Sequence, residues 1–208
     1  GVQPVPPVAA PAVTNVTVVG AGLDTFIPVI PEVRESDITA LFKLKALTPI
    51  SGRPTYESTQ LCEKELGRNA LAIKVPFGGG KRGCLGLVYS DVKYLAEAGH
   101  AWTVPASQGT YPTFTAGASD QDKKATILQF IQTEKGIKTV EKVEELLKNM
   151  FLECIDEDYV VELKQGLNEY DGRTLRKLLA HMKKYGKMDD AVHSTIMDTF
   201  RAAPDLDL

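Results

Sequence analysis

The residues best suited to chemistry form a row of cations near the C-terminus. Residues 173–188 read RTLRKLLAHMKKYGKM, and cations recur in this stretch at steps of three, four and seven, with His181 filling the gap: Arg173, Arg176, Lys177, Lys184 and Lys187. No acidic residue interrupts the row, and leucines and a methionine hold a different helical face. One side of this helix is therefore predicted to be basic. It either contacts phosphate, as in RNA, or is solvated, or meets acids such as Glu153–Asp158 on a neighbouring helix or subunit.

A second candidate is the loop that reads GGGKRG, which places Lys81 and Arg82 after three glycines. A phosphate-binding loop of the nucleotide hydrolases needs a hydroxyl directly after the lysine and a helix that begins there. Arg82 stands in the hydroxyl position, and the apolar run Cys84–Tyr89 that follows is typical of a strand. We therefore expect a turn that is solvated or whose two cations meet a phosphate backbone or an acidic neighbour, without nucleotide hydrolysis.

A third stretch, Val18–Asp24 (VVGAGLD), has two of the glycines of a dinucleotide-binding turn. The third glycine, which lets the helix pack closely on its strand, is replaced by Thr25. Pro28 and Pro31 would also interrupt the helix that should hold the pyrophosphate. This stretch is predicted to be a turn after a short strand rather than a nucleotide site.

Neither the histidines nor the cysteines form a set that could catalyse a reaction or bind a metal. The chain has three of each, and none is paired at ligand spacing: His100, His181, His193, Cys62, Cys84 and Cys154. An acidic group at 153–158 is expected to cap the start of a following helix. We therefore predict no catalytic residue, no cofactor, no metal site and no enzymatic activity.

Composition places the chain among soluble globular proteins. It has 208 residues, of which 43% are hydrophobic and 25% charged, and its net charge is -3. The surface as a whole thus has no attraction for nucleic acid, so RNA binding would require a local patch. No stretch approaches the ~20 apolar residues of a membrane span, and no signal peptide is recognisable at the start. The odd cysteine count favours a reducing compartment, and the initial Gly1 indicates a fragment or a processed product.

Short amphipathic helices are expected to position these residues. Residues 1–35 are rich in proline and predict an extended arm, with one short strand at Val16–Val19. In the section that follows, a helix is predicted over Ile38–Leu47 after a cap at Ser36-Asp37, and another over Asp91–Ala98 after Ser90. Between them, a helix capped by Thr55 should run to about Ile73, with Leu61, Glu65/Leu66 and Ala70/Leu71 at helical spacing. A short β-hairpin or strand is predicted around 75–89, and residues 100–117 form a long extended connector.

The last third is predicted to be helical throughout. A helix over residues 120–135 begins at Ser119-Asp120 and ends near Gly136, and a second runs from Thr139 to about Cys154. Further helical turns are expected over Asp156–Leu163, followed by a polar loop at Asn168–Gly172. The basic helix then follows, with Leu175, Leu178, Leu179, Met182 and Tyr185 on its apolar face and a stop at Gly186, and a final helix opens at Asp189-Asp190. The fold class is therefore mainly α.

The order of several weak motifs resembles the Gag-like region of copia-type retrotransposon polyproteins. Residues 52–89 (GRPTYESTQLCEKELGRNALAI, a GGG loop, then GCLGLVY) match its first part, and Tyr111–Ala118 matches its YP…PAGA element. Ile155–Leu163 and Thr174–Met188 match its two C-terminal helical patterns. The similarity spans roughly residues 28–202. Two features depart from the family: Cys84 replaces its usual histidine, and the zinc knuckle of many Gag proteins is absent.

This resemblance implies a retroviral-capsid-like, two-lobed helical protein. The arm would be residues 1–35, the N-terminal lobe with its connector 36–118, and the C-terminal lobe 119–208. The protein would be a structural Gag capsid protein of an LTR retrotransposon that self-assembles into cytoplasmic virus-like particles around RNA. Its partners would be copies of itself and RNA, with neither a membrane nor a small-molecule substrate. The alternative is a domesticated, Gag-derived helical scaffold or adaptor that binds one protein or RNA partner without forming shells.

Overall fold

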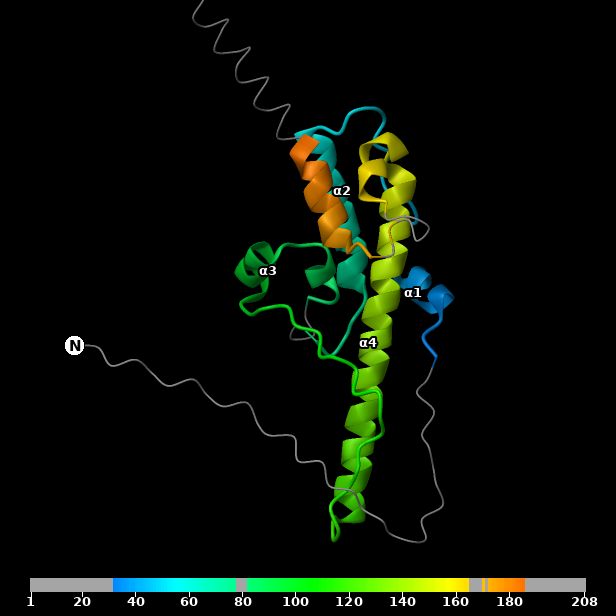
Figure 1. Ribbon diagram of the computed structural model, residues 1–208, viewed down its shortest axis with the longest axis vertical. Coiled ribbons are helices and arrows are strands. Elements are labelled where there is room, and N and C mark those ends of the chain that lie inside the picture. The colour runs from blue at the N-terminus through cyan, green and yellow to red at the C-terminus, as the bar shows by residue number, and fades with distance from the viewer. Residues whose placement is uncertain (1–31, 78–81, 165–169, 171, 186–208) are drawn as a thin grey trace, which may run out of the picture.

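The computed structural model describes residues 32–77, 82–164, 170 and 172–185. Within these ranges the chain is mainly helical, as predicted, and contains no strand (Figure 1). The α-helices are α1 (Glu35–Leu41), α2 (Tyr56–Ala72), α3 (Asp91–Ala98) and α4 (Asp120–Cys154), and residues 175–185 are also helical. Three 3-10 turns accompany them: η1 (Leu85–Leu87), η2 (Glu157–Tyr159) and η3 (Val161–Leu163).

The longest element, α4, is one continuous helix of 35 residues, so the predicted break near Gly136 is wrong. Gly136 lies buried inside the helix, where a Cβ atom would come within 2.9 Å of both Phe77 and Pro76. The glycine is therefore a contact point for a distant segment and not a helix stop. Its helix propensity costs about 1 kcal/mol relative to alanine, and the close approach of two rings offsets that cost.

The predicted cap of α2 at Thr55 is confirmed, and the cap is reciprocal. The Thr55 side chain accepts a hydrogen bond from the Ser58 backbone N–H, and the Ser58 side chain accepts one from the Thr55 N–H. The face predicted at helical spacing is confirmed in part: Glu65, Leu66 and Ala70 are buried, whereas Leu61 and Leu71 are exposed.

Helix α1 differs from its prediction at both ends. It begins after Arg34 instead of Ser36-Asp37, and it ends at Leu41 instead of Leu47. Side chains of α2 bind the segment that was expected to continue the helix. Asn69 bonds both the N–H and the C=O of Leu44, and the Glu65 carboxylate accepts from the N–H and hydroxyl of Thr48. These bonds satisfy backbone groups that a helix would otherwise pair internally.

The predicted hairpin or strand around 75–89 is wrong for the residues that the structure describes there, whereas 78–81 lie outside them. The chain instead turns back on the C-terminus of α2 and forms η1. Gly83 adopts a φ of +50°, and the Cys84 N–H donates to the Ala70 carbonyl at 3.0 Å. A Cβ on Gly83 would lie 2.6 Å from the Ile73 carbonyl oxygen, so only glycine fits this close approach.

Other local predictions hold. The caps at Ser90 and Ser119 are confirmed, since each side chain accepts from a backbone N–H in the first turn of its helix. Asp156 caps η2 in the same manner, which supports the capping role expected for the acidic group. Residues 101–115 have no regular structure, as predicted for the connector, and the buried Glu134 of α4 accepts hydrogen bonds from Ser107 and the Gln108 N–H.

One hydrophobic cluster joins these elements. Its fully buried members include Leu66 from α2, Phe151 from α4 and Leu175 from the C-terminal helical segment. The cluster thus draws on both sides of the predicted lobe boundary at 118/119, and the division into lobes stays a prediction. Most of the arm, the strand at Val16–Val19, the stop at Gly186 and the final helix lie outside the described residues. Among the helices that the structure describes, none has the length and apolar character to cross a membrane.

The close contact between Gly83 and the C-terminal carbonyls of α2 leads to a stability prediction. We expect Gly83→Ala to lower the free energy of unfolding by about 3 kcal/mol, because the new methyl group meets three carbonyl oxygens at 2.6–2.9 Å and the residue keeps a positive φ. Gly109→Ala is the matched control, since Gly109 has a φ of +63° and open space around it. Its cost should be about 1 kcal/mol. Urea denaturation followed by circular dichroism measures both, and equal losses would show that the carbonyl contacts are unimportant.

Candidate nucleic-acid interface

The basic row belongs to a helical segment that is anchored in the core. Over residues 175–185 the predicted apolar face is confirmed for four members, which are buried almost completely: Leu175, Leu178, Leu179 and Met182. Tyr185 is half-buried. The cations of the row must therefore project from the remaining faces of this helix.

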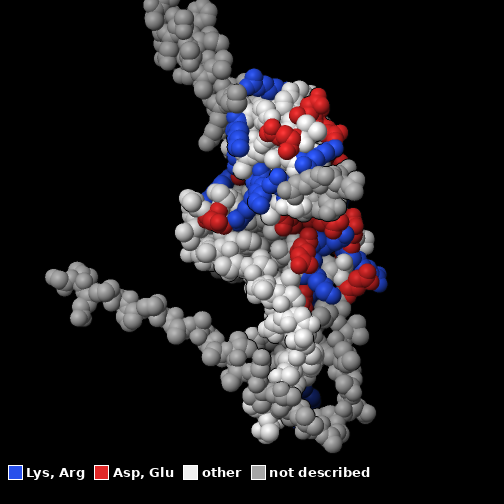
Figure 2. Space-filling model, viewed as in Figure 1, with Lys and Arg blue, Asp and Glu red and all other residues white. Residues whose placement is uncertain are grey.

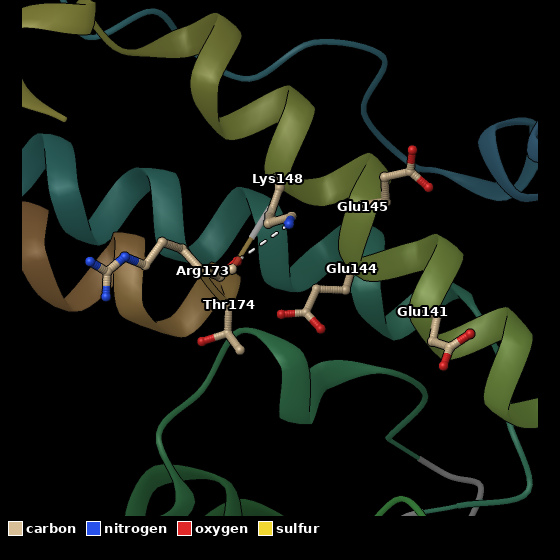
Figure 3. Close-up of a pocket in the computed structure, with 7 residues that line it drawn as sticks. Glu141, Glu144, Glu145, Lys148, Arg173 and Thr174 are labelled. Carbon is tan, nitrogen blue, oxygen red and sulfur yellow. Dashed lines mark hydrogen bonds between the residues drawn. The ribbon is translucent and has the colours of Figure 1, made fainter. Parts of the chain in front are cut away.

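The start of this segment is fixed by α4 (Figure 3). The Glu144 carboxylate accepts a hydrogen bond from the Leu175 N–H at 3.1 Å, and Lys148 Nζ donates to the Arg173 carbonyl at 3.3 Å. A carboxylate at this point pairs an N–H that the helix cannot use and suits the positive end of the helix dipole. Glu141 and Glu145 line the same cavity beside it. This acidic cavity is therefore a structural joint between α4 and the basic segment.

Two cations near or in the predicted row are neutralised by acids from other elements. Arg176 Nη1 lies 2.6 Å from Asp91 Oδ1 at the first turn of α3. Lys183, which the sequence prediction did not include, lies 2.8 Å from Glu63 Oε1 of α2. The interpretation that acids of neighbouring helices meet these cations thus holds for Arg176, although the acid is not one of Glu153–Asp158.

The remaining cations of the row divide into an anchored and an exposed set. Arg173 is half-buried, and its Nε donates to the Leu163 carbonyl at 3.4 Å. Lys177 and Lys184 are exposed and form no ion pair within the described part of the chain. These two lysines are the positions of the row best placed to meet an external anion.

His181 was expected to fill the gap in the basic row, and this expectation is wrong. Its side chain is buried, with Nε2 3.1 Å from the Tyr159 carbonyl oxygen and 3.0 Å from Glu162 Oε1. The ring therefore faces η2 and η3 instead of solvent. Spacing alone could not separate it from the lysines, because residue 181 lies on the border between the apolar and the basic face.

The loop cations are not assembled with this row. Arg82 Nη2 donates to the Glu97 carbonyl at 3.0 Å, near the C-terminal end of α3, whereas Arg176 contacts the first turn of the same helix. Lys81 and Lys187 lie outside the described residues. Figure 2 shows the charge on the face that carries residues 175–185, where blue cations are interspersed with red acidic side chains. The patch is therefore mixed in sign and not uniformly basic.

Sequence reasoning missed the charge cluster centred on Glu63. This carboxylate is only 2% exposed and binds two lysines, Lys183 and Lys93, the latter at 3.1 Å from Oε2. Lys93 also lies over the Tyr89 ring, 3.8 Å from its centroid. The cluster ties α2, α3 and the basic segment together. Glu63 lies between Cys62 and Leu66 on the buried face of α2, and an acid at such a position is a signal of a buried ion pair.

The cysteines are all buried, and burial raises the pKa of the Cys84 thiol to about 12. His100 is exposed and bonds its neighbour Ala101, whereas His193 lies outside the described residues. The described residues contain no group of three His, Cys, Asp or Glu side chains arranged to hold a metal ion. Comparison with protein-family models, curated proteins and solved structures finds no match to this chain.

The exposed lysines yield a first test. We expect Lys177→Glu/Lys184→Glu to lower the RNA content of the purified protein, because both side chains are exposed and neither forms an ion pair within the described residues. In titrations with single-stranded RNA, losing two phosphate contacts should reduce the slope of log K against log salt by roughly 1.4.

The control carries the same charge change elsewhere. Lys135→Glu/Lys138→Glu alters two exposed lysines of α4 that lie outside its projecting end, and it should leave both quantities near those of the wild type. If the two double variants lose RNA equally, the effect is one of net charge, and the 177/184 surface has no special role.

The Glu63 cluster yields a stability test. Glu63→Gln keeps the shape of the side chain but removes the charge that binds two ammonium groups, and we expect the free energy of unfolding to fall by about 2 kcal/mol. Glu153→Gln, at an exposed position, should change it by less than about 0.5 kcal/mol. Urea titration measures both. An unchanged stability for Glu63→Gln would mean that the cluster does not hold the three helices together.

Proposed function

We propose that this chain is a structural protein that self-assembles, as the Gag capsid proteins of copia-type retrotransposons do, and that it forms virus-like particles around RNA in the cytoplasm. The proposal includes a two-lobed capsid-like arrangement with a proline-rich arm. The observation that carries it is the projecting end of α4 together with the uncharged connector that lies along it (Figure 1).

The projecting end contributes little to the core. At 1.5 Å per residue the 35 residues of α4 extend about 52 Å. The first buried residue of the helix is Phe130, so ten residues, 120–129, add no buried side chain. Leu128 in this part is 58% exposed. A helical end of this length gains little stability by itself, and packing against another molecule would supply what the chain's own core does not.

The connector gives this region an uncharged surface. Residues 101–119 contain no Lys, Arg, Asp or Glu, and the face of the projecting part that Figure 2 shows is largely white. The charged residues of this part are those of the first turns of α4: Asp120, Asp122, Lys123 and Lys124. Tyr111 packs edge-on against Phe130, with ring centroids 5.5 Å apart. The centres of protein–protein interfaces are depleted of charge and enriched in aromatic residues. The surface formed by residues 101–119 together with Leu128 therefore suits contact with a protein better than contact with solvent.

Self-assembly explains how modest surfaces of this kind become sufficient. Repeated contacts between identical subunits close into symmetric shells when the rotation between neighbours allows it. Each contact gains from the others, because a subunit held at one site is at a high effective concentration at the next. RNA would add a second stabilising partner through Lys177 and Lys184.

The second candidate is a Gag-derived scaffold or adaptor that binds one protein or RNA partner without forming shells. The mixed charge around residues 175–185 favours it, because the described surface offers only Lys177 and Lys184 from the predicted row without an acidic or backbone partner. Particle formation separates the two candidates.

Negative-stain microscopy and light scattering test the proposal directly. We expect uniform particles of megadalton mass for the purified wild type. A clean monomer or dimer at high protein concentration, in both low and high salt, would falsify the shell and leave the adaptor.

A point variant then locates the contact. Leu128→Glu places a charge in the exposed apolar position of the projecting helix and should reduce the particle fraction at least tenfold, which corresponds to about 1.4 kcal/mol per contact. Gln129→Glu adds the same charge at the next exposed position and should assemble normally. Circular dichroism should show both variants folded, because residue 128 contributes nothing to the core.

A further inference from the structure

The core contains a pair of cysteines whose sulfur atoms touch. Cys62 in the middle of α2 and Cys154 at the last position of α4 are 92 residues apart in sequence, yet their Sγ atoms lie 3.9 Å apart. Both side chains are buried. The Cys154 Sγ also contacts the Phe151 carbonyl at 3.1 Å, which orients it, and the Cys154 carbonyl accepts a 2.6 Å bond from the Ile50 N–H.

The geometry points to a reversible intramolecular disulfide between Cys62 and Cys154, formed by thiol–disulfide exchange with a low-molecular-weight disulfide such as oxidised glutathione. A disulfide requires the sulfurs to approach to about 2.05 Å, so a movement of roughly 2 Å is needed. Rotation of the side chains can provide it without moving the helix axes, because the two sulfurs already face each other across the α2–α4 contact.

The exchange proceeds in two steps that balance. The thiolate of Cys154 attacks one sulfur of oxidised glutathione, forms a mixed disulfide and releases one glutathione thiolate. The thiolate of Cys62 then attacks Cys154 Sγ, which forms the Cys62–Cys154 bond and releases the second glutathione. Two protons pass from the protein thiols to the two glutathione thiolates, so the protein loses two electrons and glutathione gains them.

The order of the steps follows from the surroundings of the two sulfurs. The hydrogen bond between them raises the pKa of Cys62, and burial raises it further. The same hydrogen bond lowers the pKa of Cys154. Cys154 also stands at a helix end, where opening is easier than in the middle of α2. Cys154 is thus the first nucleophile.

Cys84 does not belong to the pair. It is fully buried beside the C-terminus of α2, and its thiol has a strongly raised pKa from burial alone. The described part of the chain brings no second sulfur into contact with it. It therefore serves as an internal control in the same molecule.

The disulfide would join α2 to the end of α4. It would lie next to the parallel bridge between Ile50 and Ile155, which already holds the segment before α2 against the residue after α4. A link between positions this far apart removes many conformations from the unfolded chain and so stabilises the native one. The inference does not depend on self-assembly, since it concerns two residues inside one subunit.

The test is to incubate the folded, reduced full chain with oxidised glutathione and to map it by non-reducing mass spectrometry. We expect the intact mass to fall by two hydrogens, a single Cys62–Cys154 cross-linked peptide, and Cys84 still alkylatable after unfolding. Oxidation should raise the melting temperature by roughly 10 °C, and a reductant should reverse the rise.

Two variants sharpen the result. Cys84→Ala should keep the mass change and the thermal shift, whereas Cys154→Ala should lose both. The wild-type peptide map stands without either variant should one fail to fold. The inference is overturned if the folded wild type yields only glutathione adducts, intermolecular disulfides or a disulfide with Cys84. It is equally overturned if no thiol is lost in the folded state while the same thiols oxidise in urea.

Discussion

The contact between α2 and the C-terminal half of α4 is the constraint on which the rest of the structure depends. One hydrophobic cluster buries side chains of both helices almost completely: Leu66 and Ala70 from α2, and Val143, Leu147 and Phe151 from α4. The other elements are short, and none could bury a comparable apolar surface alone. Helix α1, η1 and the segment 175–185 therefore gain their order by packing on this pair, with the two contacting cysteines inside it.

Three carboxylates of the two long helices, two buried and one half-buried, then hold the irregular segments. Glu65 binds Thr48, Glu134 binds Ser107 and the Gln108 N–H, and Glu144 binds the Leu175 N–H. In a chain whose described part has no sheet, loop backbone groups need such partners. These three acids therefore stabilise the chain internally, and contacts with a partner would have to use other residues, on the outer surface.

That surface has two unlike regions. The body carries cations and acids side by side around residues 175–185 (Figure 2). The connector, residues 101–119, contains no Lys, Arg, Asp or Glu, and the charges of the projecting end are confined to the first turns of α4. The first suits a weak, salt-sensitive contact with an anion, and the second suits an apolar contact with protein. A protein that assembles through one region and touches RNA with the other would use both.

The sequence by itself determined the features whose cause lies within one element: the helix caps at Thr55, Ser90 and Ser119, the extended connector, and the apolar face of residues 175–185. Only the tertiary structure decided the rest. The helix continues through Gly136, whose missing side chain lets Phe77 and Pro76 pack closely against α4. The residues after Gly83 form a 3-10 turn where the chain folds back on the C-terminus of α2. His181 is buried and Arg176 is paired because of residues remote in sequence. Periodicity reports which face of an element is apolar, but a partner brought close by folding decides what each glycine or charge on that element does.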